Sequence, residues 1–424
     1  MNSRQRVLTA LAHREPDRVP VDLGGTRVTG ITAVAYNRLK AHLGLADAPT
    51  KVFDISQQLA ELEEEILQRF GVDVIALNRV QTGFGIMNWA WKEWRLPDGS
   101  PCLVSTQFDP VREEGGGDER SRGSGQRVGN EVSERDRSSW ALVRDGVVVA
   151  RMPARSFYFT RVHYPLAGVT TREEVDAYPW PTISDEELAY LRRRARHLYE
   201  NTDYAIVGEF GGNILEWGQD LRGWDVFLMD LVIHKDLAHH LMDRMVECHL
   251  RNLERYLDAV GDYIQIIQMG DDLGTQWGPQ ISPQLYREMI KPRHQRVYGY
   301  VKEHSDIYVF LHSCGAIFDL IPDLIEAGVD ILNPVQTSAR GMDPVALKRK
   351  FGQALTFWGG GCDTQRVLPR GTPEEVQRDV RERLRIFAPG GGYVFAQVHN
   401  VQPDVPPENL VAMFQAVQEF GAYR

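Results

Sequence analysis

The chain has 424 residues, of which 43% are hydrophobic and 25% charged, and its formal net charge is −10. This is the composition of an ordinary globular protein with a sizeable core, and the acidic balance disfavours a nucleic-acid-binding protein, which needs a basic face. The first residues show no apolar leader and no stretch approaches about 18 uncharged apolar residues, so we expect a cytoplasmic protein that does not enter a membrane.

Short β-rich runs recur along the chain, and several are followed by polar or glycine residues and then by a helical pattern. This alternation is typical of β/α units, and eight such units close a barrel. The sequence therefore predicts an α/β protein with a (β/α)8 TIM-barrel fold. The eight runs are Val19–Leu23, Val72–Leu77, Tyr204–Gly208, Tyr263–Met269, Ile307–Leu311, Val329–Leu332, Leu355–Trp358 and Tyr393–Val398.

One segment interrupts the pattern, because residues 111–139 are rich in glycine and charge and contain no aromatic residue. Such a composition buries too little apolar surface to order itself as part of a core. We expect a flexible insertion here, with the strand-like runs Cys102–Thr106 and Ala141–Ala150 on either side forming a hairpin or lid near the barrel mouth. A surface loop without function is an equally open alternative. The remainder of residues 1–424 is expected to form a single barrel domain.

Polar and titratable residues follow most of the predicted strands. A TIM barrel places its active site at the C-terminal ends of its strands, so these residues would converge on one face. The alternative is that loops after strands are polar in any protein. The residues of interest are Glu209, Asp271, Asp272, His312, Cys314, Asn333, Gln336, Cys362 and His399.

Three of these residues, His312, Cys314 and Cys362, supply soft ligands that zinc favours. His312 and Cys314 stand two positions apart at the end of a predicted strand, where residues i and i+2 point the same way, and Cys362 follows three glycines later in the chain. One imidazole and two thiolates would leave a fourth position free, as in catalytic zinc sites. The alternative is a hydrogen-bonded core histidine with two small buried cysteines.

The other candidates have less specific signals. Asp271 and Asp272 are candidates for acid–base catalysis, for completing a metal shell or for orienting His312, and their adjacency lets at most one face the metal. For His399 we favour a hydrogen bond to the substrate, with a fourth metal ligand or a core histidine as alternatives. Glu209, Asn333 and Gln336 are expected to bind substrate, the last two through their amides; the alternative is ordinary loop polarity.

Motifs at both ends of the chain carry a family resemblance. The segments 4–11, 15–20 and 390–395, together with the pattern His312-x-Cys314…Cys362, resemble the uroporphyrinogen decarboxylase superfamily, and within it the zinc-dependent branch of corrinoid methyltransferases. The resemblance implies a (β/α)8 barrel with zinc on His312, Cys314 and Cys362. It also implies transfer of a methyl group between a small ether, alcohol-derived or thiol substrate and the cobalt of a corrinoid (cobalamin) protein.

The chain lacks the Asp-x-His-x-x-Gly pattern of corrinoid-binding proteins, so we expect the corrinoid to be carried by a separate partner protein. A second hypothesis is a metal-independent decarboxylase, for which Arg27, Arg79 and Arg340 near strand ends are the candidate carboxylate-binding groups. A third is a barrel that only binds a partner. The oligomeric state is left open, with a homodimer as one alternative.

Overall fold

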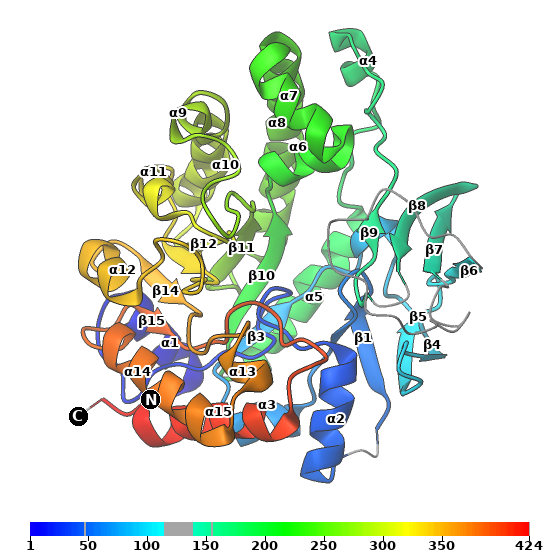
Figure 1. Cartoon of the computed structure of the whole chain (residues 1–424). Coiled ribbons are helices and arrows are strands. Elements are labelled where there is room, and N and C mark those ends of the chain that lie inside the picture. Colours follow the sequence, from blue (N-terminus) through cyan, green and yellow to red (C-terminus); the bar gives the residue numbers. More distant parts are fainter. Residues whose placement is uncertain (46–47, 114–138, 154–155, 424) are drawn as a thin grey trace, which may run out of the picture.

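The computed structural model describes residues 1–45, 48–113, 139–153 and 156–423. Its centre is a sheet of seven strands in the spatial order β15-β14-β13-β12-β11-β10-β3, and every neighbouring pair is parallel (Figure 1). The strands are β3 (Val74–Leu77), β10 (Ala205–Gly211), β11 (Ile266–Gly270), β12 (Tyr308–His312), β13 (Ile331–Asn333), β14 (Thr356–Trp358) and β15 (Tyr393–Val394).

The segment around Val21 closes this sheet into a barrel. Val21 forms a parallel bridge with Phe395, just after β15, and the backbone N–H of Asp22 donates to the Phe395 carbonyl over 2.8 Å. On the other side, the N–H of Asp73 donates to the Val21 carbonyl over 2.8 Å, next to β3. The predicted (β/α)8 fold is therefore confirmed. The first of the eight predicted strands is present only as this bridging segment.

Helices surround the barrel and pack their apolar faces on it, as α14 illustrates (Figure 1). Thr372 caps this helix by accepting from the N–H of Glu375, and the Glu375 side chain completes a capping box. The buried residues of α14 are Val376, Val380, Leu384 and Phe387, spaced three or four apart as one helical face requires.

The helices are α1 (Ser3–Leu11), α2 (Ala33–Leu43), α3 (Glu64–Phe70), α4 (Arg172–Asp176), α5 (Asp185–Asn201), α6 (Leu215–Arg222), α7 (Trp224–Ile233), α8 (Lys235–Val260), α9 (Pro283–Leu285), α10 (Lys291–His304), α11 (Ile321–Glu326), α12 (Pro344–Phe351), α13 (Val367–Arg370), α14 (Pro373–Phe387) and α15 (Pro407–Phe420). Within the described parts of the chain, no helix has the length and apolar character needed to cross a membrane.

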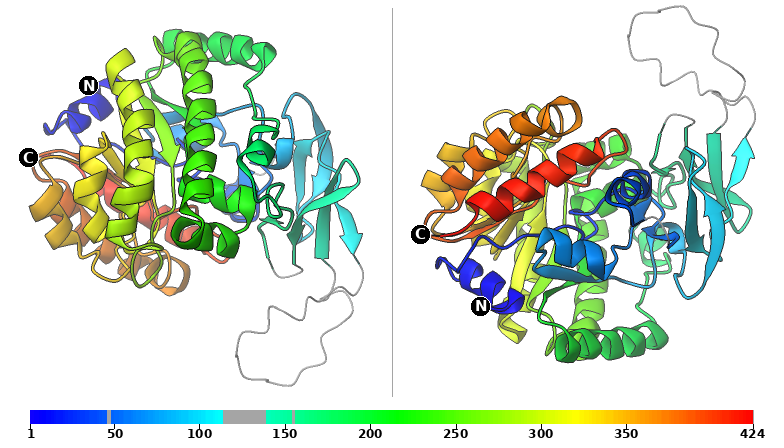
Figure 2. Two further views of the ribbon diagram at one scale, coloured as in Figure 1. Left: turned by 90° about the horizontal axis from the view of Figure 1, so that it is seen from above. Right: turned by 90° about the horizontal axis from the view of Figure 1, so that it is seen from below.

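A β-rich layer lies on one side of the barrel (Figure 2). It holds two four-stranded sheets, ordered β2-β1-β5-β4 and β6-β7-β8-β9. Their strands are β1 (Thr50–Asp54), β2 (Leu59–Ala60), β4 (Trp91–Arg95), β5 (Pro101–Ser105), β6 (Val111–Glu113), β7 (Ser139–Arg144), β8 (Val147–Met152) and β9 (Thr160–Arg161).

Both strand-like runs predicted beside the insertion are strands, but they do not pair with each other. β5 pairs with β1 and β4, whereas β7 pairs with β6 and β8, so the hairpin of this region is formed by the antiparallel neighbours β7 and β8 and not by the two runs together. A second strand within 141–150 was missed, because the Asp145-Gly146 turn that separates β7 from β8 was included in one run. Residues 114–138, the middle of the predicted flexible insertion, lie outside the described residues.

Candidate metal and substrate site

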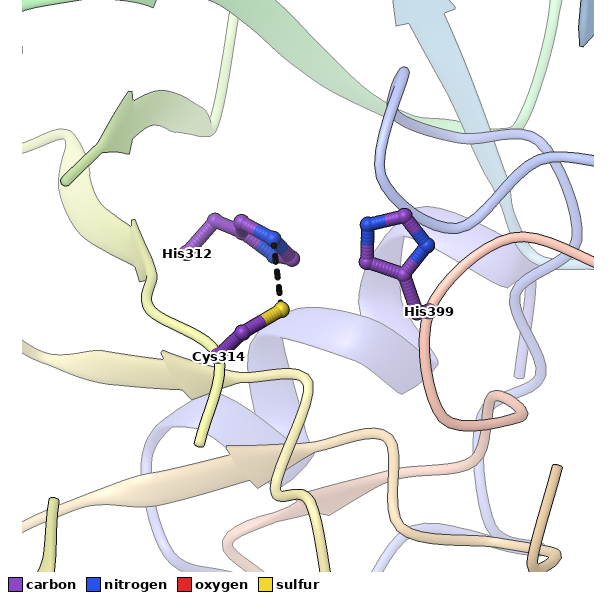
Figure 3. A group of neighbouring side chains, drawn as sticks. All are labelled: His312, Cys314 and His399. Atoms are coloured by element: carbon purple, nitrogen blue, oxygen red, sulfur yellow. Dashed lines mark hydrogen bonds between the residues drawn. The ribbon is translucent and has the colours of Figure 1, made fainter. Parts of the chain in front are cut away.

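Three side chains from two sides of the barrel mouth meet at one point. His312 ends β12, Cys314 follows it by two residues, and His399 comes from the segment after β15 (Figure 3). One nitrogen from each histidine and the Cys314 sulfur all lie within 4.8 Å of one another. The group lies at the C-terminal ends of the barrel strands, as predicted for a barrel active site.

The orientation of His312 is set by Asn333, its register partner on β13. The Asn333 amide nitrogen donates to the Trp358 carbonyl over 2.9 Å, so its oxygen faces His312 Nδ1 at 2.6 Å. Since an amide oxygen only accepts, Nδ1 carries the proton and Nε2 is the acceptor nitrogen. His312 Nε2 lies 3.4 Å from Cys314 Sγ, within hydrogen-bond distance of the thiol. A metal-binding histidine is commonly oriented in this way, with its other ring nitrogen donating to an oxygen.

The backbone around Cys314 is fixed by two hydrogen bonds. Its own N–H donates to Asp272 Oδ1 over 2.7 Å, and the N–H of Gly315 donates to Gln336 Oε1 over 2.8 Å. Gly315 has a φ of 88°, and a Cβ there would lie 2.5 Å from the Gly274 carbonyl carbon, so the turn requires glycine. Burial, followed by the negative charges of Asp272 and Glu216, raises the pKa of the Cys314 thiol well above its ordinary value.

His399 is held in an unusual backbone conformation. Its φ of 60° is in the left-handed region, and its ring centre lies 5.3 Å from that of His312. Burial, followed by the neighbouring His312, lowers the pKa of His399 to about 3. A neutral imidazole aimed at a cysteine and a second histidine has the chemistry of a metal ligand. His399 therefore occupies the place in the group that we expected Cys362 to fill.

Cys362 does not join the group. It is fully buried, and its pKa is raised well above the ordinary value by burial and then by Asp379, a hydrogen-bond partner of its thiol on α14. The glycines before Cys362 explain why its side chain points away from the group. A Cβ on Gly359 would lie 2.4 Å from the Pro334 carbonyl oxygen, and a Cβ on Gly361 would lie 2.3 Å from the Phe395 ring. The chain thus passes close to its neighbours, and the thiol lies against the helix layer.

The adjacent aspartates have different surroundings. Asp271 is fully buried, and its carboxylate accepts from the N–H groups of Ile214, Leu215 and Glu216 and from His294 Nε2, at 2.8 to 3.1 Å. It thereby caps the start of α6. Asp272 instead faces the candidate metal group formed by His312, Cys314 and His399, with its Oδ1 3.8 Å from His312 Nε2. These contacts assign a structural role to Asp271 and leave only Asp272 as a candidate for acid–base chemistry.

The three side chains fit a zinc ion by their chemistry. One thiol and two imidazoles are soft and borderline ligands of the kind zinc prefers, and three protein ligands leave a position for substrate. The negative charge of Asp272 contributes to the raised pKa of the Cys314 thiol, and the same charge favours a bound cation. His312 and His399 would supply nitrogen ligands and Cys314 a thiolate.

A cavity of about 640 Å³ opens beside this group. Glu209, one of the predicted substrate-binding residues, lines the cavity, and its carboxylate accepts from the backbone N–H of Arg79 over 3.1 Å. Asn333 and Gln336 do not line it, because their amides are used to hold His312 and the loop after Cys314. The cavity walls include the aromatic residues Tyr164, Phe210, Trp217 and Trp224.

Two residues of this cavity were missed in the sequence. Glu216, in the first turn of α6, accepts from the Asp272 N–H over 2.9 Å and from Asn213 Nδ2 over 2.6 Å. Burial, followed by Asp272 and Asp271, raises the pKa of Glu216 to about 8. Gln268 lies within β11 and is 4% exposed. A glutamine inside an apolar strand was a usable signal for Gln268, whereas an acidic residue in a first helical turn is too common to be one.

Comparisons with known proteins agree with this architecture. Residues 164–420 match the family model described as "Uroporphyrinogen decarboxylase (URO-D)". A uroporphyrinogen decarboxylase from Thermus thermophilus is 25% identical over 251 residues, which cover 57% of this chain and 67% of the relative. One from Pseudoalteromonas translucida is 27% identical over 188 residues, 40% of this chain and 48% of the relative. In structure, a methyltransferase from Methanosarcina mazei superposes over the whole of both chains with a TM-score of 0.56 at 16% identity.

Proposed function

This chain belongs to the uroporphyrinogen decarboxylase family, and from that premise we propose that it is a zinc-dependent methyltransferase. Its substrates would be a small molecule, which is an ether, an alcohol-derived compound or a thiol, and a separate corrinoid protein. The single observation that carries the proposal is the convergence of His312, Cys314 and His399 within 4.8 Å at the mouth of the barrel. This ligand set replaces the one expected from the sequence, in which Cys362 was the third ligand.

Each surrounding residue would have a defined task. Asn333 keeps His312 in the tautomer that presents Nε2, and Gln336 and Asp272 hold the loop that carries Cys314. Bound zinc would act as a Lewis acid, lowering the pKa of a substrate thiol or polarising a leaving oxygen. Asp272, close to this point and one-third exposed to the cavity, would accept the thiol proton or return a proton to the leaving oxygen.

The arginines argue against a decarboxylase that acts on a polycarboxylated pyrrole. Such a substrate needs several cationic side chains free to receive its carboxylates. Arg27 is paired with Asp54 at 2.6 Å, and Arg79 forms two hydrogen bonds with Glu187 at 2.6 and 2.8 Å. Arg340, the third candidate, is exposed and does not line the cavity. The methyltransferase is therefore better supported than the decarboxylase.

Two measurements test the proposal together. Purified protein should contain close to one zinc ion per chain by elemental analysis. With a methylated corrinoid protein and a candidate thiol, or with a methyl ether and the reduced corrinoid protein, the visible spectrum of the corrinoid should report methyl transfer. Carbon dioxide release from uroporphyrinogen by metal-free protein, with no methyl transfer to or from any corrinoid protein, would contradict the proposal and support the decarboxylase.

A further inference from the structure

The walls of the cavity beside the metal group are rich in acceptors. Three ionised carboxylates line it, those of Glu209, Asp220 and Asp272, with two guanidinium groups, those of Arg27 and Arg161, while Glu216 adds a protonated carboxyl group. Arg27 is paired with Asp54 at 2.6 Å and more loosely with Glu209 at 3.4 Å, and Arg161 is paired with Asp220 at 3.1 Å. His249, which also lines the cavity, has its pKa lowered to about 4, chiefly by burial, and adds no positive charge at neutral pH. Negative charge is therefore in excess.

Gln268 provides an independent indication of what this cavity binds. Gln268 is only 4% exposed and lines the cavity, and its buried side-chain oxygen has no hydrogen-bond partner among the residues that the structure describes. A buried acceptor without a donor is costly, and such an atom at a cavity wall marks the place of a missing donor. The missing group must present an N–H or O–H to this oxygen.

The sheet register places this acceptor below the metal group. Gln268 stands opposite Glu209 on β10, and Gly270, two residues further along β11, stands opposite His312. Two residues of a strand span roughly 7 Å, with side chains on the same face. Gln268 and Glu209 thus lie one layer deeper in the barrel than His312, and a small molecule can reach from one layer to the other.

We propose that this cavity selects a small substrate bearing a protonated amine, whose N–H groups bind Gln268 Oε1 and the carboxylates of Glu209 and Asp272. The inference rests on the proposed function for the other end of the molecule, which would face His312, Cys314 and His399. Among the residues that line the cavity, each guanidinium already has a carboxylate partner, so a sulfonate or carboxylate head would find no free cation. The aromatic walls formed by Phe210 and Trp217 also suit an ammonium group.

A matched series of methyl thioethers tests the charge preference. The compounds are 2-(methylthio)ethylamine, 2-(methylthio)ethanol and 2-(methylthio)ethanesulfonate, which share a chain and differ in a head group of charge +1, 0 or −1. Binding to the full-length protein as purified is measured by isothermal titration calorimetry. We expect the amine to bind about tenfold more tightly than the alcohol, with the sulfonate weakest. Equal affinities, or a preference for the sulfonate, would overturn the inference.

Gln268→Met and Gln57→Met separate the acceptor from the general shape of the cavity. Both glutamines line the cavity, but the Gln57 oxygen already accepts from Asn400 Nδ2 over 2.8 Å. Gln268→Met should lower the affinity for the amine several-fold and that for the alcohol by less, because the charged donor makes the stronger hydrogen bond, whereas Gln57→Met should preserve the order of the series. An amine affinity unaffected by Gln268→Met contradicts the role of that residue.

Zinc analysis of the same protein samples distinguishes the two proposals. Protein without zinc that still prefers the amine contradicts the proposed function but supports the cavity assignment. Protein with one zinc per chain that prefers the sulfonate contradicts the cavity assignment alone.

Discussion

The loops after β12 and β14 each carry a cysteine, but the two cysteine side chains have different surroundings. Each leaves a parallel barrel strand and carries a cysteine near a glycine, yet Cys314 lies beside His312 in the metal group and Cys362 lies against Asp379 of α14. Position after a strand therefore brings a residue to the mouth of the barrel but does not decide which way its side chain points. That direction is set by close backbone packing, such as that of Gly359 on Pro334. Substitutions at paired positions test this contrast.

The largest expected difference is in zinc content. Cys314→Ser and His399→Ala should each weaken the affinity for zinc by on the order of a hundredfold or more, because each removes a ligand atom. Cys362→Ser and His249→Ala are the matched controls and should keep zinc near the level of the unsubstituted protein. Competition with a chromophoric chelator gives the affinities. Loss of zinc from Cys362→Ser with retention in His399→Ala would reverse the assignment.

The neighbouring aspartates should differ mainly in stability. Asp271→Ala removes a buried carboxylate that caps α6 and pairs with His294, and it should lower the free energy of unfolding by about 3 kcal/mol. Asp272→Ala should cost less than about 1 kcal/mol, because that carboxylate is partly exposed and accepts one backbone bond. Urea denaturation of the metal-free variants measures both. Equal losses would contradict the division of roles.

A smaller effect on zinc is expected at Asn333, which touches His312 rather than the metal position. Asn333→Leu frees the imidazole to change tautomer and should weaken zinc binding by about 10- to 100-fold. Asn333→Asp keeps an oxygen acceptor for Nδ1 and should retain most of the affinity. If Asn333→Leu binds zinc as tightly as the unsubstituted protein, Asn333 does not position His312.

A further contrast is a pH dependence of stability at Glu216. The pKa of Glu216 is about 8 in the folded protein, above the value near 4.3 for an unfolded chain, so the folded state holds the extra proton between those limits. Its contribution to stability is present at low pH and declines as the pH rises from about 5 to about 8.

Glu216→Gln should remove this decline. Relative to the unsubstituted protein, the variant should gain about 3.5 kcal/mol between pH 5 and pH 8, measured by denaturation without metal. Glu65→Gln, at an exposed position of α3, is the control and should show no such trend. A difference that is constant with pH would contradict the assigned protonation of Glu216.

Features that depend on local periodicity could be predicted from the sequence. The β/α alternation predicted the barrel correctly, because strand and helix signals lie within a few residues. The pair His312 and Cys314 could be predicted for the same reason, since their common direction follows from two-residue strand spacing. In contrast, the β-rich layer was underestimated, because its pairing joins β1 to β5 between residues 52 positions apart, such as Thr50 and Cys102.

Which side chain joins His312 and Cys314 could not be decided from the sequence, where a metal-binding His399 was only an alternative, because side-chain direction there depends on tertiary packing. Cys362 had the residue type more typical of a zinc ligand in this pattern. His399 reaches Cys314 through a left-handed backbone conformation that the local sequence does not predict. Likewise, Asn333 and Gln336 carry amides suited to substrate, and only the fold shows that other groups already use them.

Zinc K-edge X-ray absorption of the zinc-loaded protein tests the central claim most directly, because it counts the sulfur ligands. The set His312, Cys314 and His399 predicts a single sulfur neighbour at about 2.3 Å, with imidazole nitrogens at about 2.0 to 2.1 Å. Two sulfur neighbours would place Cys362 on the metal and contradict the ligand set drawn in Figure 3.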